Sequence, residues 1–285
     1  MNTDALKNLD SNILSLVQNA LIEDLPGGDI TTDALKIEKI NGHARFVAKQ
    51  DLVLSGTSFL TAAILLRSEN TSFEWHFADG EEVLKGQSFV EIEGSFAELL
   101  RAERVALNFC SHFSGIATMT NSFVDKVKHT NTKILDTRKT TPGLRFFEKK
   151  AVVDGGGVNH RMNLSDAVML KENHILAAGG MKKAVELIKN NKPEQKIEVE
   201  TTSIAEVKQA VQLGVNHIML DNMSNELMTD CLKQIPSGIL TEASGNMQLE
   251  RVQSVAELGL DFISVGAITH SAPVADISLL FDWTI

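Results

Sequence analysis

The sequence predicts an α/β fold with two parts, because the periodicity of its apolar residues changes along the chain. The first hundred residues mix helical and β-type periodicity, which indicates a mixed α+β unit. After residue 130, apolar strand-like segments alternate with amphipathic helical segments, which is typical of parallel βα units with right-handed crossovers. The 285 residues suffice for one large domain or two smaller ones, and we place a boundary between domains 1–129 and 130–285.

The N-terminal part opens with a predicted helix. Asp10 or Ser11 is suited to cap it, and its apolar residues recur at helical spacing. These residues are Ile13, Leu14, Val17 and Leu21. The sequence PGGDITT (26–32) that follows predicts a turn.

Two segments with β-type alternation and one long helix complete the first part. The alternating segments cover residues 43–54 and 73–92, and Gly-containing turns divide the second into short strands. From about 96 to 128 a wide apolar stripe predicts a long helix, which we expect Gly115 to interrupt.

The second part contains six apolar strand candidates. They cover residues 133–136, 167–171, 196–200, 217–221, 238–244 and 261–266. Helical stretches between them include 181–191, 203–214 and 248–259, of which the last two end at a glycine suited to a helix C-cap. This order predicts a barrel or an open doubly wound sheet. In either one, ligands lie outside the carboxyl ends of the strands.

Composition excludes several classes of function. A formal charge of −10 argues against broad nucleic-acid binding, which needs a basic surface. Cys110 and Cys231 lie in apolar, helix-like contexts without metal-ligand spacing, so we expect buried thiols. We find no secretory signal, no apolar run of membrane-span length, and no dinucleotide, P-loop, zinc-protease or nucleophile-elbow motif. We therefore expect a cytoplasmic protein.

Cationic side chains are nevertheless concentrated between residues 135 and 174. Six of them stand out: Arg138, Lys139, His160, Arg161, Lys171 and His174. Residues 140–143 and 155–157 between them are of the Thr, Pro and Gly types that build tight turns and expose backbone N–H groups to an anion. The segment therefore predicts a pocket for a small molecule with several negative charges.

Each of these cations also has a structural interpretation, which for His160 and Arg161 is an ordinary Gly-rich turn after residues 155–157. Arg138 offers a planar fork and Lys139 a point charge for carboxylate or phosphate, but the two could instead form a solvated loop pair with Asp136. A lysine such as Lys171 at the end of a buried strand is costly unless an anion accounts for it, which favours a functional role. His174 is equally consistent with an ordinary cap of the next segment.

Two carboxylates at strand ends, Glu200 and Asp221, are the main acidic candidates. They could hold a hydrated Mg²⁺, which binds through few protein oxygens plus substrate phosphates. They could equally support Lys171 and Arg161 as ion-pair partners. The loops at 243–246 and 264–267, each before a helix, resemble phosphate sites of barrel proteins.

These motifs together resemble a known family. They are EDLPGGDITT (23–32), RAERVALNFCSHFSGIAT (101–118), LDTRKTTPGLR (135–145), GGGVNHRMNLSDAVMLKENH (155–174), IEVE (197–200), IMLDNM (218–223), EASGN (242–246) and FISVGAITHS (262–271). In this order they resemble quinolinate phosphoribosyltransferase, the carboxylating nicotinate-nucleotide pyrophosphorylase of NAD biosynthesis. Glu172 in KENH, where many relatives carry Asp, keeps the charge.

The resemblance implies a fold, an assembly and a reaction. It implies an N-terminal α/β sandwich with a long connecting helix, a C-terminal TIM-like α/β barrel with fewer than eight strands, and a homodimer. In that dimer the N-terminal part of one subunit would cover the barrel mouth of the other, and the N-terminal helix could pack with the barrel. The reaction would join quinolinate to 5-phosphoribosyl-1-pyrophosphate with Mg²⁺, giving nicotinate mononucleotide, pyrophosphate and CO₂.

The resemblance also assigns roles to residues of this chain. The implied catalytic residues are Lys139, Lys171, Glu200 and Asp221, of which the two acids would also face the metal. The implied substrate-binding residues add Arg104, Thr137, Arg138, His160, Arg161, Ser244, Gly245, Asn246, Val265, Gly266, Ala267 and His270. Arg104 would reach the dicarboxylate from the opposite subunit, and the segments 244–246 and 265–267 would cradle the 5-phosphate.

Three other functions remain as alternatives. A lyase could use Lys171 to form a Schiff base with a carbonyl substrate. A relative of the same fold associated with molybdate transport would act on another ring acid. A phosphosugar-binding protein without catalysis would be expected to have lost part of the basic set, which is complete here.

Overall fold

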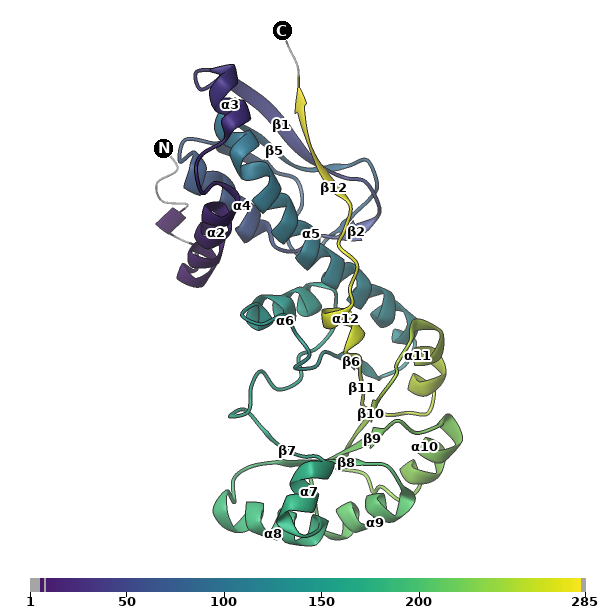
Figure 1. Cartoon of the computed structure of the whole chain (residues 1–285). Coiled ribbons are helices and arrows are strands. Elements are labelled where there is room, and N and C mark those ends of the chain that lie inside the picture. Colours follow the sequence, from purple (N-terminus) through teal and green to yellow (C-terminus); the bar gives the residue numbers. More distant parts are fainter. Residues whose placement is uncertain (1–5, 8, 283–285) are drawn as a thin grey trace. The chain divides into compact units, whose positions relative to one another are not determined.

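The computed structural model describes residues 6, 7 and 9–282 and divides the chain into two compact units. The first contains the described residues up to Met119, Val153–Gly155 and the residues from Ala272 on. The second contains Thr120–Val152 and Gly156–Ser271. Figure 1 shows the course of the chain, coloured from purple to yellow. Among the described residues, no helix combines the length and apolar character that a membrane span requires.

The first unit is built on an antiparallel sheet of four strands in the order β12-β1-β5-β3. Their bounds are β1 Asn41–Ala48, β3 Ser72–Trp75, β5 Ser88–Ser95 and β12 Ile277–Asp282. A second, two-stranded sheet pairs β2 (Leu52–Val53) with β4 (Glu82–Val83). Strand β12 had no counterpart in the sequence prediction, and it brings a late segment of the chain back to β1.

The predicted N-terminal helix is confirmed as α2 (Ser11–Asp24). Asp10 caps it by accepting a hydrogen bond from Asn12 N at 2.7 Å, and α2 packs on α4 (Thr57–Arg67). The turn predicted for 26–32 is too long, because helix α3 (Ile30–Leu35) already begins there. The Asp29 carboxylate caps α3 by accepting from Thr31 N and Thr32 N, both at 3.1 Å.

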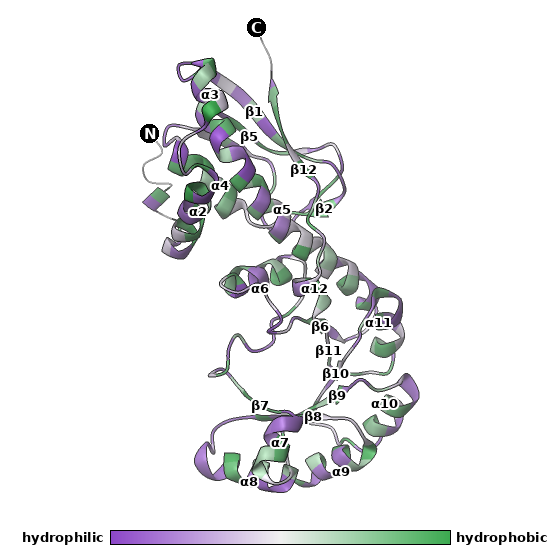
Figure 2. Ribbon diagram, viewed as in Figure 1, coloured by the Kyte–Doolittle hydropathy of each residue, from purple (hydrophilic) through white to green (hydrophobic). Residues whose placement is uncertain are grey.

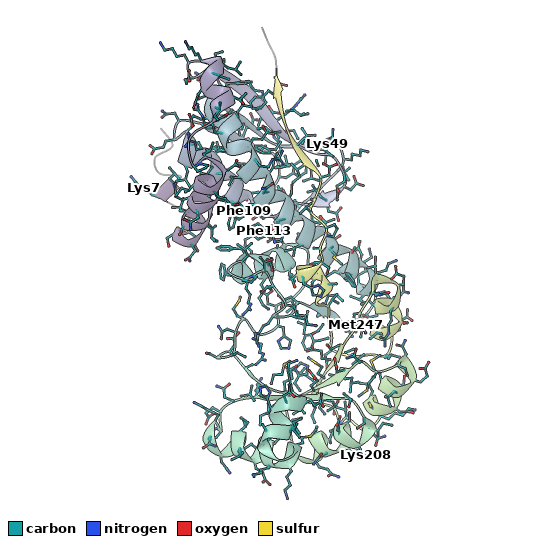
Figure 3. All side chains as sticks on the ribbon, in the orientation of Figure 1. Lys7, Lys49, Phe109, Phe113, Lys208 and Met247 are labelled. Atoms are coloured by element: carbon teal, nitrogen blue, oxygen red, sulfur yellow. The ribbon has the colours of Figure 1, made fainter. Side chains whose placement is uncertain are left out.

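The predicted long helix is confirmed as α5 (Phe96–Val127), but the expected interruption at Gly115 is wrong. A Cβ atom at position 115 would lie only 2.1 Å from the carbonyl oxygen of Pro273. Glycine therefore allows a close backbone approach here and does not break the helix. Phe59 of α4 packs on Phe109 and Phe113 of α5, with ring centroids 4.8 Å apart in both pairs. Figure 3 labels the two residues of α5.

The second unit is a parallel sheet of six strands in the order β6-β11-β10-β9-β8-β7. Their bounds are β6 Lys133–Leu135, β7 Val168–Leu170, β8 Ile197–Thr201, β9 His217–Asp221, β10 Leu240–Ser244 and β11 Phe262–Ser264. Apart from its opening between β6 and β7, the spatial order follows the chain order, which is the arrangement of an incomplete α/β barrel. The predicted fold class, an N-terminal α/β sandwich plus a barrel with fewer than eight strands, is confirmed.

Helices follow the strands of this sheet. They are α6 Arg145–Asp154, α7 Glu172–Ala178, α8 Met181–Asn191, α9 Ile204–Gln212, α10 Asn225–Leu232, α11 Leu249–Ala256 and α12 Ala267–His270. In Figure 2, α8 to α11 are each partly hydrophilic and partly hydrophobic, as expected for helices that cover a sheet with one face. In α9, for example, Val207 and Ala210 are buried.

The carboxyl ends of these strands carry polar and charged residues singled out in the sequence. Asp136 and Lys171 directly follow β6 and β7, whereas Asp221 and Ser244 are the last residues of β9 and β10. Because the strands are parallel, all of these ends lie along one edge of the sheet. That edge is where a ligand site of an α/β barrel is expected.

Candidate active site

A cavity of about 670 Å³ lies at this edge of the second unit. The predicted site residues that line it are Thr137, Arg138, Lys139, His160, Arg161, Lys171, Glu200, Asp221, Ser244, Gly245 and Asn246. Met169, Met219, Asn222 and Ser264 line it as well and were not predicted. Side chains separated by more than a hundred residues in sequence thus converge on one cavity.

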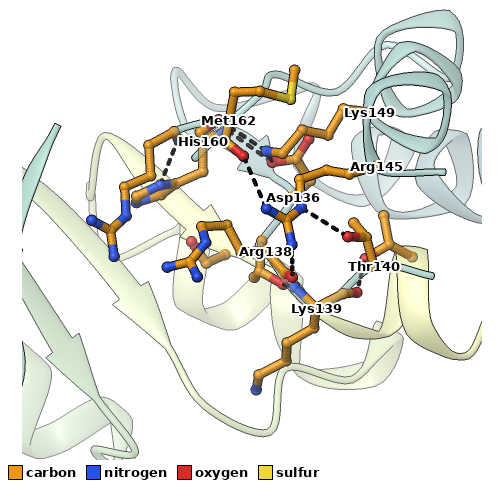
Figure 4. Close-up of polar contacts among 12 residues, drawn as sticks. Asp136, Arg138, Lys139, Thr140, Arg145, Lys149, His160 and Met162 are labelled. Atoms are coloured by element: carbon orange, nitrogen blue, oxygen red, sulfur yellow. Dashed lines mark hydrogen bonds and ion pairs between the residues drawn. The ribbon is translucent and has the colours of Figure 1, made fainter. Parts of the chain in front are cut away.

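The wall of the cavity at the end of β6 is held by a buried ion pair. The carboxylate of Asp136 accepts a hydrogen bond from Lys149 Nζ, and both side chains are fully buried. Asp136 Oδ1 also accepts from His160 N at 2.9 Å, and Lys149 Nζ donates to His160 O at 2.9 Å (Figure 4). With its amide nitrogen turned toward Asp136, Asn159 donates to Oδ2 at 2.6 Å. The interpretation of Asp136 as the partner of Arg138 and Lys139 is therefore wrong.

Arg145 fixes the loop that carries these two cations. Its Nε donates to Thr140 Oγ1 at 3.0 Å, and its Nη2 donates to Arg138 O at 3.4 Å. Its Nη1 donates to Met162 O at 3.3 Å, so one guanidinium joins 138–140 to the segment after His160 (Figure 4). The positions of the Arg138 and Lys139 backbones are therefore set before any ligand binds.

The guanidinium groups of Arg138 and Arg161 line the cavity, and neither has an ion pair with a carboxylate of the described residues. Arg138 Nε is buried and has no hydrogen-bond partner within residues 6, 7 and 9–282. Arg161 donates to Ala167 O at 2.9 Å and to Met169 Sδ at 3.6 Å. Burial lowers the pKa of Arg161, and the neighbouring charge of Arg138 lowers that pKa further. An unpaired buried donor beside a second cation favours the binding of an anion.

His160 lies between these cations and the interior of the barrel. Its Nδ1 accepts a hydrogen bond from Arg161 N at 2.7 Å, and its Nε2 lies 3.2 Å from Glu198 Oε2. Burial lowers the pKa of His160, but Glu198 and Glu242 outweigh this effect and raise the pKa overall. Both ring nitrogens are therefore used by the protein itself.

Lys171 is half-exposed and pairs with Glu200, whose carboxylate lies 2.8 Å from Nζ. This pairing is one of the two roles that the sequence left open for Glu200. A Schiff-base lysine is usually desolvated or placed beside another cation, and neither description fits this residue. His174 Nδ1 accepts from Lys171 N at 3.2 Å, so His174 caps α7.

The residues that follow β9 and β10 contact each other closely beside Asp221. Asn222 has a φ of 53° and donates its backbone N–H to Ser244 O at 3.0 Å. Gly245 has a φ of 89°, and a Cβ atom there would lie 2.2 Å from the Asn222 side-chain oxygen. Only glycine fits this position, so Gly245 serves the shape of the loop in addition to any contact with a phosphate.

Lys139 rests on the loop that follows β11. A Cβ atom on Gly266 would lie 3.2 Å from Lys139 Cδ and 3.2 Å from His270 Cδ2. Thr269 Oγ1 donates to Lys139 O at 2.8 Å. Gly266 thus lies against both Lys139 and His270. Gly266, His270, Val265 and Ala267 are not among the residues that line the cavity.

Arg104 lies elsewhere, on α5 in the first unit. It lines a separate cavity of about 530 Å³ together with Asn108, His112 and residues 274–277. Its predicted role across a subunit interface stays a prediction.

Two buried carboxylates were missed by the sequence interpretation. Glu198 and Glu242 are 6% and 0% exposed and lie on β8 and β10. Glu198 could have been found, because residues two apart in a strand point to the same face and Glu200 was already assigned to the site. Glu242 was quoted only as part of a motif.

Glu200 and Asp221 have the donor chemistry for Mg²⁺. Both carboxylates line the cavity and come from neighbouring strands β8 and β9. Asp221 Oδ2 accepts from Asn222 Nδ2 at 2.6 Å, and Glu200 accepts from Lys171, which leaves one oxygen of each carboxylate for other contacts. Mg²⁺ commonly binds through one or two carboxylates, waters and substrate phosphates, so the two residues fit this ion.

Comparison with known proteins extends the geometric description to the whole chain. The family model of the quinolinate phosphoribosyl transferase N-terminal domain matches residues 29–114, and that of the C-terminal domain matches residues 116–280. The chain belongs to the quinolinate phosphoribosyltransferase family. The two models together span most of the described residues, including every residue that lines the cavity.

Individual relatives agree with this family. The chain is 40% identical to a quinolinate phosphoribosyltransferase [decarboxylating] of Nicotiana tabacum over 95% of this chain and 83% of that protein. It is 40% identical to a probable nicotinate-nucleotide pyrophosphorylase [carboxylating] of Synechocystis, covering 92% and 90% of the two chains. The solved nicotinate-nucleotide pyrophosphorylase of Francisella tularensis superposes with a TM-score of 0.91 at 37% identity, covering 95% and 96% of the two chains.

Proposed function

We propose that this protein transfers the phosphoribosyl group of 5-phosphoribosyl-1-pyrophosphate to quinolinate and decarboxylates the adduct. The products are nicotinate mononucleotide, pyrophosphate and CO₂. The observation that carries this proposal is the convergence of Arg138, Lys139, Arg161 and Lys171 on one cavity. Both substrates are polyanions, and family membership supports the choice of this pair among polyanions.

The cations would bind and orient the two anions. The planar forks of Arg138 and Arg161 suit the two carboxylates of quinolinate, because a guanidinium bonds a carboxylate in a bidentate manner. Lys139 and Lys171 would contact the ring acid and the phosphorylated sugar. Lys171 could exchange its contact with Glu200 for a substrate oxygen, since that pair is partly exposed to the cavity.

Transfer forms a bond between the pyridine nitrogen and C1 of the ribose as the bond from C1 to pyrophosphate breaks. Positive charge develops on the sugar ring during this exchange. Glu200 and Asp221, which both line the cavity, would stabilise that charge. Holding both reactants in one cavity lowers the entropic part of the barrier.

Decarboxylation follows from the product of the first step. Once the nitrogen is alkylated, the pyridinium stabilises the electron pair that stays on the ring carbon when the adjacent carboxylate leaves as CO₂. A proton from solvent or a protein group then replaces CO₂ on that carbon. The chemistry therefore requires no Schiff base or thiamin cofactor.

We propose Mg²⁺ as the cofactor, held by Glu200 and Asp221 either directly or through water. When bound, the ion would offset negative charge on the pyrophosphate group. The loops at 244–246 and 265–267 are proposed to contact the 5-phosphate of the sugar. Gly245, whose φ of 89° turns the chain beside Ser244, supports this assignment of the first loop.

We also propose that the protein acts as a homodimer to which Arg104 contributes across the interface. An equal mixture of inactive Arg104→Ala and Lys171→Ala proteins should then regain up to about a quarter of the sites by random re-pairing of subunits. No recovery despite demonstrated subunit exchange would place Arg104 outside the partner's site. A cytoplasmic location is a further proposal, which cell fractionation tests.

The decisive experiment supplies the purified protein with quinolinate, 5-phosphoribosyl-1-pyrophosphate and magnesium. We expect nicotinate mononucleotide by mass spectrometry, and CO₂ only when both substrates are present. Lys139→Ala is the matched control: it should abolish turnover and leave the melting temperature nearly unchanged, because Lys139 is exposed. Product formed from another ring acid alone, or substrate trapped on Lys171 by borohydride, would favour the alternatives instead.

A further inference from the structure

Two cationic side chains of α6 connect the same two segments of the cavity wall. The first segment, residues 136–140, follows β6, and the second, residues 160–162, precedes β7. Arg145 and Lys149 are four residues apart in α6, so both project from one face of the helix. Neither side chain lines the cavity, so any effect on a ligand passes through the two segments.

Lys149 connects the beginnings of the two segments. Its Nζ donates to the Asp136 carboxylate and, at 2.9 Å, to His160 O. Because the ion pair with Asp136 is fully buried, replacing Lys149 would leave an uncompensated charge in the interior. This connection is therefore part of the framework that the fold itself requires.

Arg145 connects the same segments further along each of them. Its guanidinium donates to Arg138 O at 3.4 Å and to Thr140 Oγ1 at 3.0 Å in the first segment. It donates to Met162 O at 3.3 Å in the second segment (Figure 4). All three acceptors are neutral oxygens, so replacing Arg145 leaves no buried charge without a partner. The connection made by Arg145 can therefore be removed while the fold is kept.

The position of Arg145 is unfavourable for α6 itself. Arg145 is the first residue of this helix, where the partial positive charge of the N-terminus repels a cation. Glu148, in the same first turn, accepts from Thr141 N at 3.0 Å and so holds the first segment as well. The bonds of Arg145 to the two segments, and not the stability of α6, account for a cation at this place.

The connected segments carry the two guanidinium groups that are proposed to bind the carboxylates of quinolinate. Arg138 belongs to the first segment, and Arg161 lies between His160 O and Met162 O, which α6 holds in the second. The side chain of Arg161 is further restrained by its bond to Ala167 O at 2.9 Å. A ring acid with carboxylates on adjacent carbons must meet both forks at one fixed spacing, whereas a monocarboxylate needs only one fork.

We propose that Arg145 is a positioning residue that sets the spacing of Arg138 and Arg161 and thereby selects a ring acid with carboxylates on adjacent carbons. It acts through the backbone, since its three bonds go to the loops and none of its atoms lines the cavity. The selection of the acid rests on the proposed function, whereas the connection of the two segments does not. Lysine cannot replace this arginine, because a single ammonium group does not span three acceptors as a planar fork does.

Calorimetric titrations with quinolinate and with nicotinate, which lacks the second carboxylate, test the selection. No sugar donor is present, so neither acid reacts. In Arg145→Lys and Arg145→Met the affinity for quinolinate should fall about tenfold or more, whereas that for nicotinate should change less than about threefold. Lys208→Met, at an exposed lysine of α9, is the matched control for loss of a charge and should leave both affinities unchanged.

Steady-state kinetics with the sugar donor separate positioning from a general loss of folded protein. In Arg145→Lys the KM for quinolinate should rise about tenfold or more while kcat falls less than about threefold, because loss of folded protein would lower kcat alone. Thr140→Val removes one of the three acceptors and should raise the same KM by a smaller factor. It carries the same test if the Arg145 variants fail to fold.

Hydrogen exchange of the protein alone tests the connection without any substrate. Backbone amides in residues 137–141 and 160–163 should exchange about tenfold faster in Arg145→Lys and Arg145→Met than in the wild type. The amides of β10, which bond to β9, should exchange at the wild-type rate in all variants.

Three results would overturn the proposal. They are an equal loss of affinity for quinolinate and nicotinate, full recovery in Arg145→Lys of what Arg145→Met loses, and wild-type exchange rates in both segments. The second result would mean that the charge alone matters. If the wild type neither binds nor converts a ring acid, the proposed function fails, but the exchange rates still decide whether Arg145 holds the two segments.

Discussion

Two lysine–carboxylate pairs in the second unit have the same chemistry and opposite surroundings. Lys149 and Asp136 are both 0% exposed, whereas the side chains of Lys171 and Glu200 are 47% and 18% exposed. The buried pair has additional bonds to the backbone of His160 and to Asn159. For the pair of Lys171 and Glu200, the structure gives one hydrogen bond, at 2.8 Å.

The difference in burial indicates that one pair holds the backbone in place and that the other can exchange its partners. A buried pair whose remaining donors and acceptors are all bonded holds one geometry, because any movement would leave a charge uncompensated in the interior. A pair at the surface of a cavity gains little from its own contact and loses little when a ligand replaces one partner. We infer that Asp136 and Lys149 fix the backbone, while Lys171 and Glu200 remain available to substrates.

The largest expected effect is on stability, from Lys149→Met. The substitution leaves the Asp136 charge buried without its partner, which should lower the free energy of unfolding by about 3–5 kcal/mol in urea denaturation. The double variant Asp136→Asn/Lys149→Met removes both charges and should recover most of that loss. Equal losses in the single and double variants would contradict an uncompensated charge as the cause.

Replacing the lysine of the exposed pair should have the opposite result, with a small loss of stability and a large loss of activity. Lys171→Met should lower the free energy of unfolding by less than about 1 kcal/mol, because partly exposed pairs contribute little. It should lower kcat/KM for quinolinate by about 100-fold or more, as loss of a charge that contacts the reacting groups does. A stability loss as large as that of Lys149→Met would remove the distinction between the pairs.

A smaller effect is expected for the acids that share the cavity with Lys171. Glu200→Gln and Asp221→Asn should each raise the Mg²⁺ concentration for half-maximal activity about tenfold, which corresponds to about 1.4 kcal/mol. Steady-state rates over a magnesium titration measure this change, with Glu194→Gln, at an exposed glutamate in the turn before β8, as the control. An unaltered titration in both variants would place the metal elsewhere.

The smallest effect concerns pH and adds the buried acid Glu242 to the comparison. Its pKa is raised from 4.5 to about 8, so the folded state retains a proton that the unfolded state has released. The contribution of Glu242 to the free energy of unfolding is full below pH 4.5. It falls as the pH rises from 4.5 to about 8 and is lost at higher pH. Relative to Glu242→Gln, the wild type should lose about 1 kcal/mol between pH 7 and pH 8. A constant difference over this interval would mean that Glu242 is ionised throughout.

Much of the fold follows from local sequence patterns. Helix α8 spans the predicted residues 181–191, and all six strands of the second unit overlap their predicted ranges. These elements have strong periodicity, clear caps and β-branched residues, which single sequences display well. The expected interruption at Gly115 failed because the reason for that glycine is the carbonyl of Pro273, which is distant in sequence.

The residues of the candidate site also fall into two groups, those that a local sequence pattern reveals and those that depend on long-range contacts. The cations that follow strands were recognisable because charge at the end of an apolar strand is conspicuous, and a motif resemblance supported them. The partner of Asp136 was not recognisable, because Lys149 lies on α6 and looks like an ordinary helical surface residue in the sequence. Long-range pairing of this kind depends on which helix face meets which strand end, and no local pattern specifies it.

Strand β12 has a consequence for biosynthesis. Residues 277–282 pair with β1, so the first sheet lacks an edge strand until residues 277–282 have left the ribosome. The six strands of the second unit are all complete earlier. During translation the barrel can therefore assemble before the four-stranded sheet of the first unit is complete. Until then, β1 has an unpaired edge. Released chains truncated before residue 277 should keep the protease protection of the barrel and lose part of that of the N-terminal sheet.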